Sequence, residues 1–120
     1  MKKLMLLVFA LIIALPSFAA LKEKDVIGTW KYKVETDQGD ITGTIVFEKK
    51  EGKLVGEVHT DDGQILPFGK VEIQENDMVY MELDTGYEMM KVSVTVKSKV
   101  FEGRVVTDQV DFPITGEKVE

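Results

Sequence analysis

Apolar and polar residues alternate along most of the chain after residue 27. Trp30, Tyr32 and Val34 show the pattern most clearly, because Lys31 and Lys33 stand between them. Successive side chains of a strand point to opposite faces, so this period of two predicts strands with one buried and one solvated face. The same pattern predicts eight strands, over residues 28–36, 41–49, 53–60, 64–73, 78–84, 87–97, 100–107 and 110–118.

Short polar turns separate these segments. Asp61-Asp62-Gly63 and Asp84-Thr85-Gly86 are examples, and both place Gly or Asx residues where a tight turn needs a positive φ. Strands that follow one another through such turns, with no amphipathic helix between them, predict an antiparallel meander. In the segment 64–73 the apolar positions change parity, and Gly69 lies where they change. We expect a β-bulge there.

The number of strands bears on how the sheet is closed. An open sheet of eight strands would expose two long edges to aggregation, and closure removes both edges. We therefore expect an all-β fold: an eight-stranded antiparallel up-and-down β-barrel formed by a single domain, residues 20–120. A β-sandwich would satisfy the same alternation and is the alternative.

The first 19 residues have a different character. Lys2 and Lys3 precede an unbroken apolar run from Leu4 to Leu15, and Ser17-Phe18-Ala19 places small residues at the −3 and −1 positions of a cut after Ala19. The run is shorter than the roughly 20 apolar residues that span a bilayer. These features predict a signal peptide over 1–19. They also predict export to the periplasm or the extracellular space, with no stable membrane span after cleavage.

Charge and composition exclude several functions. The formal net charge is −6, and it becomes −8 if Lys2 and Lys3 are removed with the signal peptide. An acidic domain with a single arginine, Arg104, is a poor partner for nucleic acid. There is no cysteine, which excludes disulfides, thiol catalysis and thiolate metal sites. For the oligomeric state of the mature domain, we expect a monomer.

The residues that could support catalysis are few. His59 is the sole histidine, and after the predicted cut the serines are Ser93 and Ser98, neither in a nucleophile-elbow motif. The acidic turns are too short to supply by themselves the six to eight oxygens that calcium takes. The sequence thus predicts a protein that is not an enzyme, with no catalytic residue, no metal site and no cofactor.

Gly28-Thr29-Trp30, at the start of the first predicted strand, carries a family resemblance. A Gly-x-Trp followed by an eight-stranded meander resembles the calycin superfamily, which includes the lipocalins and the fatty-acid-binding proteins. The resemblance implies a ligand- or partner-binding barrel rather than an enzyme. It also implies that Trp30 closes one barrel end beneath an Arg or Lys of the last strand. Lys118 lies on that strand and Arg104 on the one before, so the sequence leaves two alternatives for the cation that packs over Trp30.

Two functions remain. The first is an exported binding module for a small apolar ligand, whose expected contacts are the large inward side chains Trp30, Tyr32, Phe47, Met81, Met90 and Phe101. The alternative is a protein-interaction or inhibitor module of the cell envelope that takes no small-molecule ligand. In that case the outward set Tyr80, Tyr87 and Met89 would form the contact patch with an envelope protein.

Overall fold

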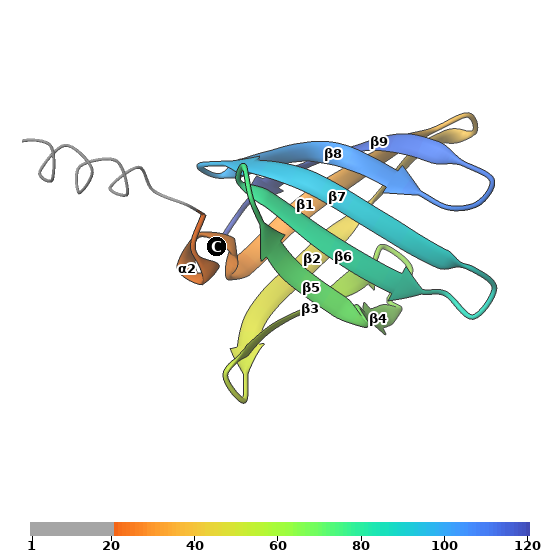
Figure 1. Cartoon of the computed structure of the whole chain (residues 1–120). Helices are drawn as coiled ribbons and strands as arrows, with labels where there is room; N and C mark the ends of the chain where they lie inside the picture. The colour runs from red at the N-terminus through yellow and green to blue at the C-terminus, as the bar shows by residue number, and fades with distance from the viewer. Residues whose placement is uncertain (1–20) are drawn as a thin grey trace, which may run out of the picture.

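The structure is a computed structural model that describes residues 21–120 (Figure 1). The predicted signal peptide, 1–19, and its cleavage site lie outside the described residues. Among residues 21–120, no helix has both the length and the apolar character needed to cross a membrane.

Nine antiparallel strands form one sheet, and a one-turn helix, α2 (Glu23–Val26), precedes them. The strands are β1 (Gly28–Thr36), β2 (Gly39–Lys50), β3 (Lys53–Thr60), β4 (Ile65–Pro67), β5 (Lys70–Gln74), β6 (Met78–Asp84), β7 (Met89–Lys97), β8 (Val100–Val106) and β9 (Asp111–Lys118). Their order in the sheet is β4-β3-β2-β1-β9-β8-β7-β6-β5. Since all nine strands belong to one sheet, the sandwich alternative is wrong.

The sheet curls into a barrel, and residues 68 and 69 join its two edges. Phe68 N–H donates a hydrogen bond to the Gly56 carbonyl of β3 at 2.9 Å, and Gly69 N–H donates to the Glu82 carbonyl of β6 at 2.9 Å. Strands β4 and β5, the two ends of the sheet order, are therefore consecutive pieces of one chain segment (Figure 1). The all-β barrel predicted from the alternation is confirmed.

The prediction of one continuous strand over 64–73 needs a correction. The structure divides this segment into β4, which pairs with β3, and β5, which pairs with β6. Pro67 ends β4, and proline has no N–H to continue a ladder. The break falls at the parity change around Gly69, where the pattern predicted a bulge. What occurs there is a change of partner strand.

The predicted inner and outer faces are confirmed. The inward residues form one buried cluster, whereas no polar or charged side chain is buried among residues 21–120. The cluster consists of Val26, Trp30, Tyr32, Val34, Ile45, Phe47, Val58, Val79, Met81, Leu83, Val92, Val94, Val96, Phe101, Val105 and Ile114. The period of two thus placed the core correctly on the strands where the alternation is clear.

Inward glycines make room for two phenylalanine rings. A Cβ at Gly56 would lie 2.8 Å from Cδ1 of Phe47, and a Cβ at Gly116 would collide with the ring of Phe101. Glycine in a strand often marks such a close approach. These two positions let Phe47 and Phe101 lie flat against the barrel wall, so the rings fill the interior.

Helix α2 is the element that the pattern missed. Four residues are too few to show a helical period, so no amphipathic signal exists for it. Its one buried residue is Val26, 1% exposed. The helix lies at the same end of the barrel as the marked C-terminus (Figure 1).

Candidate functional site

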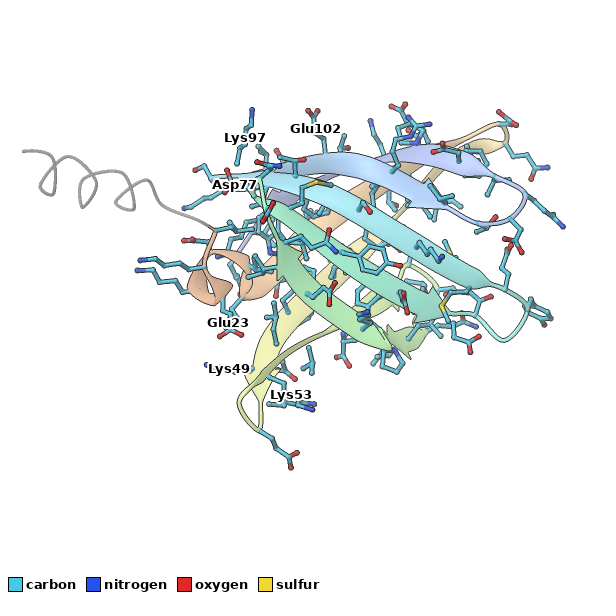
Figure 2. The ribbon with its side chains drawn as sticks, viewed as in Figure 1. Glu23, Lys49, Lys53, Asp77, Lys97 and Glu102 are labelled. Carbon is cyan, nitrogen blue, oxygen red and sulfur yellow. The ribbon has the colours of Figure 1, made fainter. Side chains whose placement is uncertain are left out.

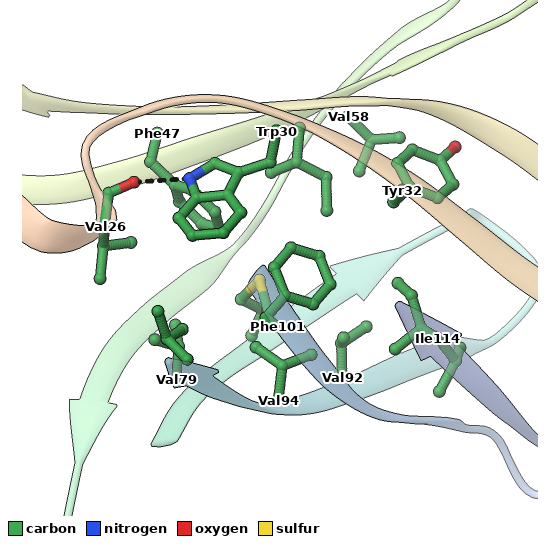
Figure 3. Close-up of a cluster of buried hydrophobic side chains, with 14 of the residues drawn as sticks. Val26, Trp30, Tyr32, Phe47, Val58, Val79, Val92, Val94, Phe101 and Ile114 are labelled. Carbon is green, nitrogen blue, oxygen red and sulfur yellow. Dashed lines mark hydrogen bonds between the residues drawn. The ribbon is translucent and has the colours of Figure 1, made fainter. Parts of the chain in front are cut away.

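One end of the barrel, which we call the closed end, is filled by side chains around Trp30 (Figure 3). Trp30 is fully buried, its Nε1–H donates a hydrogen bond to the Val26 carbonyl of α2 at 2.9 Å, and its ring centroid lies 5.3 Å from that of Phe101. Because the indole N–H is satisfied by the helix, the tryptophan is buried at no hydrogen-bonding cost.

Lys118 is the cation that covers Trp30. Its Nζ lies 5.8 Å from the indole centroid and 3.5 Å from the Asp25 carbonyl. Arg104, the other candidate, instead donates through Nε to Asp111 Oδ1 at 2.7 Å on the outer surface. The last strand therefore supplies the partner of Trp30, and α2 and Lys118 together cap the closed end.

The opposite end, which we call the open end, contains an apolar cavity of about 260 Å³. Both halves of the barrel contribute to its wall, which consists of Tyr32, Val34, Thr36, Ile41, Ile45, Val58, Phe68, Leu83, Glu88, Met90, Val92, Val105, Thr107, Val110, Phe112 and Ile114. Most of these side chains are aliphatic or aromatic. Four carry side-chain oxygens, namely Tyr32, Thr36, Glu88 and Thr107.

The six predicted ligand contacts separate between the two ends. Tyr32 and Met90 line the cavity. The other four belong to the packed part of the barrel: Phe101 lies against Trp30, and Phe47 and Met81 are buried. Contact of any of the six with a ligand stays a prediction.

Several cavity residues were not singled out from the sequence, among them Val105, Phe112 and Ile114. The alternation had already placed Val105 on the inner face, but it did not say at which height the interior would be unfilled. Side-chain size gives no reliable signal, since Met90 and Phe112 line the cavity whereas Val79 and Val94 are buried in the packed part.

Charge is distributed unevenly between the two ends. We define the open rim as residues 36–40, 61–64, 84–89 and 107–111, which connect the strands around the cavity. It holds no lysine or arginine but eight acidic residues: Asp37, Asp40, Asp61, Asp62, Asp84, Glu88, Asp108 and Asp111. Asp111 pairs with Arg104, and the other seven form no salt bridge within the part of the chain that the structure describes.

The closed rim, defined as residues 22–25, 50–53, 74–78, 97–100 and 117–120, is balanced: seven lysines stand beside seven acidic residues. Figure 2 labels Glu23, Lys53, Asp77 and Lys97 in this region, and Glu23 forms a 3.1 Å ion pair with neighbouring Lys49. The charge difference was available in the sequence, because alternate turns of an up-and-down meander lie at the same end.

The rim charge affects Tyr32, on the cavity wall. Burial raises the pKa of the Tyr32 hydroxyl above its ordinary value of 10.0, and the negative charge of Asp61 raises it further. Thr42 donates a hydrogen bond to this same Asp61, which fixes the carboxylate at the rim. Tyr32 is therefore a neutral hydroxyl at neutral pH.

The outer face offers little for catalysis. His59 Nε2 lies 2.9 Å from Glu57 Oε1 on β3, while Ser93 lies on β7 and Ser98 in the β7–β8 turn. The described residues contain no group of three or more metal-ligating side chains that could hold an ion. Of the outward patch, Tyr87 is 97% exposed, whereas the Tyr80 hydroxyl donates to Glu82 at 2.7 Å and this bond raises the pKa of Tyr80.

The sequence matches no protein-family model and no curated protein. Solved structures do resemble the fold. A redesigned β-barrel has a TM-score of 0.63 at 16% identity, over 85% of this chain and 100% of that one. A fluorescence-activating β-barrel designed de novo has a TM-score of 0.58 at 14% identity, over 81% and 96%. A redesigned β-barrel bound to DFHBI has a TM-score of 0.59 at 17% identity, over 81% and 97%. These likenesses show the fold alone.

Proposed function

We propose that this protein is a non-enzymatic binding module whose open end takes a small, mainly apolar ligand. The carrying observation is the cavity of about 260 Å³ beside an otherwise packed interior. A barrel of eight strands has room for side chains alone or for one small ligand. An engineered apolar cavity of about 150 Å³ binds benzene, so the larger one here suits a ligand of about two fused rings.

The closed end supports the same proposal. Trp30 beneath Lys118 of the last strand is the arrangement that a calycin-like barrel would have, and calycins are binders. Among the structural neighbours, one barrel is bound to DFHBI. With one end capped by α2 and the other end hollow, a ligand would reach the interior through the open rim.

A neutral fluorescent probe built on two fused rings, 6-propionyl-2-(dimethylamino)naphthalene, tests the cavity directly. We expect its emission to rise on binding to the protein and to titrate to saturation. Val105→Phe should abolish most of that rise, because Val105 lines the cavity and a phenyl ring would fill it. Val106→Phe is the matched control, since Val106 is the next residue and is 39% exposed on the outer face.

The outcome depends on both variants being folded, which circular dichroism checks. Ile114→Ala enlarges the cavity and should retain probe binding even if Val105→Phe is destabilised. If the wild-type protein leaves the probe dark, or if Val105→Phe and Ile114→Ala both bind it as the wild type does, the cavity is not the binding site.

Export is part of the proposal, carried by the apolar run and the small-residue site of 1–19. Expression of the full chain in a bacterium, followed by fractionation and N-terminal sequencing, should recover a protein that begins at Ala20 in the periplasm or the medium. A protein with an intact Met1 in the cytoplasm would contradict it.

One observation favours the alternative, an interaction module for an envelope protein. Tyr87 is 97% exposed and Met89 is 45% exposed, both at the open end. Exposed aromatic and methionine side chains are enriched in protein interfaces. Capture of a specific envelope protein that is lost on Tyr87→Ala but kept on Val105→Phe would favour this function over the cavity.

A further inference from the structure

We propose that the cavity selects ligands that carry a positive charge next to a compact apolar body, for example an amine attached to an aromatic ring system. This inference rests on the proposed function and names the ligand class of the same site. Its basis is the conjunction of an apolar cavity with a rim that contains eight acidic residues and no basic one.

Glu88 links the two features. It lines the cavity and belongs to the β6–β7 loop of the open rim, so a ligand in the cavity would lie beside this residue. Its side chain is exposed, and it forms no salt bridge among the described residues. A cationic group at this position would gain Coulombic attraction while keeping part of its hydration, so no charge would have to be buried.

The other acidic side chains extend this local preference to the whole mouth. Asp37, Asp61 and Asp108 come from the three other loops of the rim. Charges of one sign around an opening with low-dielectric walls focus the potential and raise the local concentration of the opposite charge. An anion of the same shape would approach against this potential, so a carboxylate-bearing ligand such as a fatty acid is disfavoured.

The closed rim shows that this distribution is not a mere consequence of an acidic chain. With seven lysines and seven acidic residues it is neutral, although it belongs to the same domain. The excess negative charge is therefore concentrated where the cavity opens. The acidic loops alone would make no site, because hairpin turns favour Asp for conformational reasons. The hollow that they surround is what gives their charge a ligand to act on.

Three naphthalene compounds that share one ring system test the proposal: naphthalen-1-ylmethylamine as the cation, naphthalen-1-ylmethanol as the neutral compound and naphthalen-1-ylacetate as the anion. We expect the order cation, neutral, anion in calorimetric affinity, with at least about a tenfold difference between cation and anion at low salt. Raising the salt from about 0.01 M to about 1 M shortens the Debye length from about 30 Å to about 3 Å. The difference should then largely disappear.

Paired charge-neutralising variants locate the effect. Glu88→Gln combined with Asp108→Asn removes two charges from the open rim and should reduce the cation-to-anion ratio several-fold. Glu51→Gln combined with Glu75→Gln removes two charges from the closed rim and should leave the ratio unchanged. Both pairs change the net charge equally, and neither replaces an apolar residue of the cavity wall.

The outcomes separate this inference from the proposed function. If all three compounds bind with equal affinity, charge selection is overturned while the binding module stands. If the closed-rim pair lowers the ratio as much as the open-rim pair, the rim is not its source and the inference is overturned. If none of the three binds, both proposals fail.

Discussion

The two ends of the barrel share one strand pattern but differ in what fills them. At the closed end Trp30 is 0% exposed, Phe101 packs against it, and α2 supplies a hydrogen bond to the indole. At the open end the same inward alternation surrounds a cavity of about 260 Å³. One end is thus a core and the other a candidate site. Alternation makes a barrel, whereas tertiary packing and the capping of each end decide whether its interior is filled.

Charge follows the same division. The closed rim is balanced and the open rim is acidic. Exposed ion pairs contribute little to stability, so the balanced closed rim adds little to the fold, whereas the acidic open rim shapes the potential at the cavity. The closed end can be expected to carry most of the stability, and the open end most of the selectivity.

The largest effect should come from the closed end. Trp30→Ala removes a fully buried indole, its hydrogen bond to Val26 and its contact with Phe101. We expect a loss of about 3–5 kcal/mol in the free energy of unfolding, measured by urea denaturation. Phe112→Ala, a half-buried aromatic at the cavity, should cost clearly less. Equal losses for the two variants would mean that the ends do not differ in packing.

Two valines of β7 allow the packing of the two ends to be compared on a single strand. Val94 is 2% exposed in the packed part of the barrel, whereas Val92, 5% exposed, lines the cavity. Val94→Ala should lower the free energy of unfolding by about 2 kcal/mol and Val92→Ala by about 1 kcal/mol, because part of Val92 already faces empty space. Thermal or urea denaturation of both variants measures the difference. A larger loss for Val92→Ala would contradict the assignment of the cavity.

The smallest effect concerns alkaline pH. Because the pKa of Tyr32 is raised above 10.0 in the folded protein, the unfolded chain loses this proton first as the pH rises through 10. The native state then binds more protons, so stability falls with rising pH. Tyr32→Phe removes this contribution and should flatten the decline in unfolding free energy above pH 10. Tyr87→Phe, at a 97% exposed position, is the control and should keep the wild-type slope. An unchanged slope in Tyr32→Phe would contradict the burial of its hydroxyl.

The sequence places most residues of the candidate site on the inner face, but it does not show which of them surround the cavity. Tyr32 and Met90, predicted ligand contacts because they are large and face inward, both line the cavity. Trp30, Phe47, Met81 and Phe101, predicted for the same reason, lie in the packed part. Size alone cannot separate the two groups, because a large side chain fills space wherever it lies. Small size does not separate them either, because Val92 and Val105 line the cavity whereas Val94 is packed.

Two features of the fold could not be predicted from the local sequence pattern. The segment 64–73 shows its parity change in the sequence, yet the division into β4 and β5 depends on Phe68 and Gly69 bonding to different strands, which are distant along the chain. Helix α2 has four residues and no periodic signal. Its position is set by tertiary contacts, since Val26 is buried and its carbonyl meets the indole of Trp30.

The sequence by itself determined which residues face inward, where the long strands lie and that the chain is an all-β meander, because the pleat has a period of two and turns require particular residues. It also determined the sign of the charge at each turn. Only the tertiary structure decided that residues 68–69 join the sheet edges, that Lys118 rather than Arg104 covers Trp30, and that the unfilled volume lies at the acidic end. These depend on contacts between residues far apart in the sequence, and a local pattern carries no information about them.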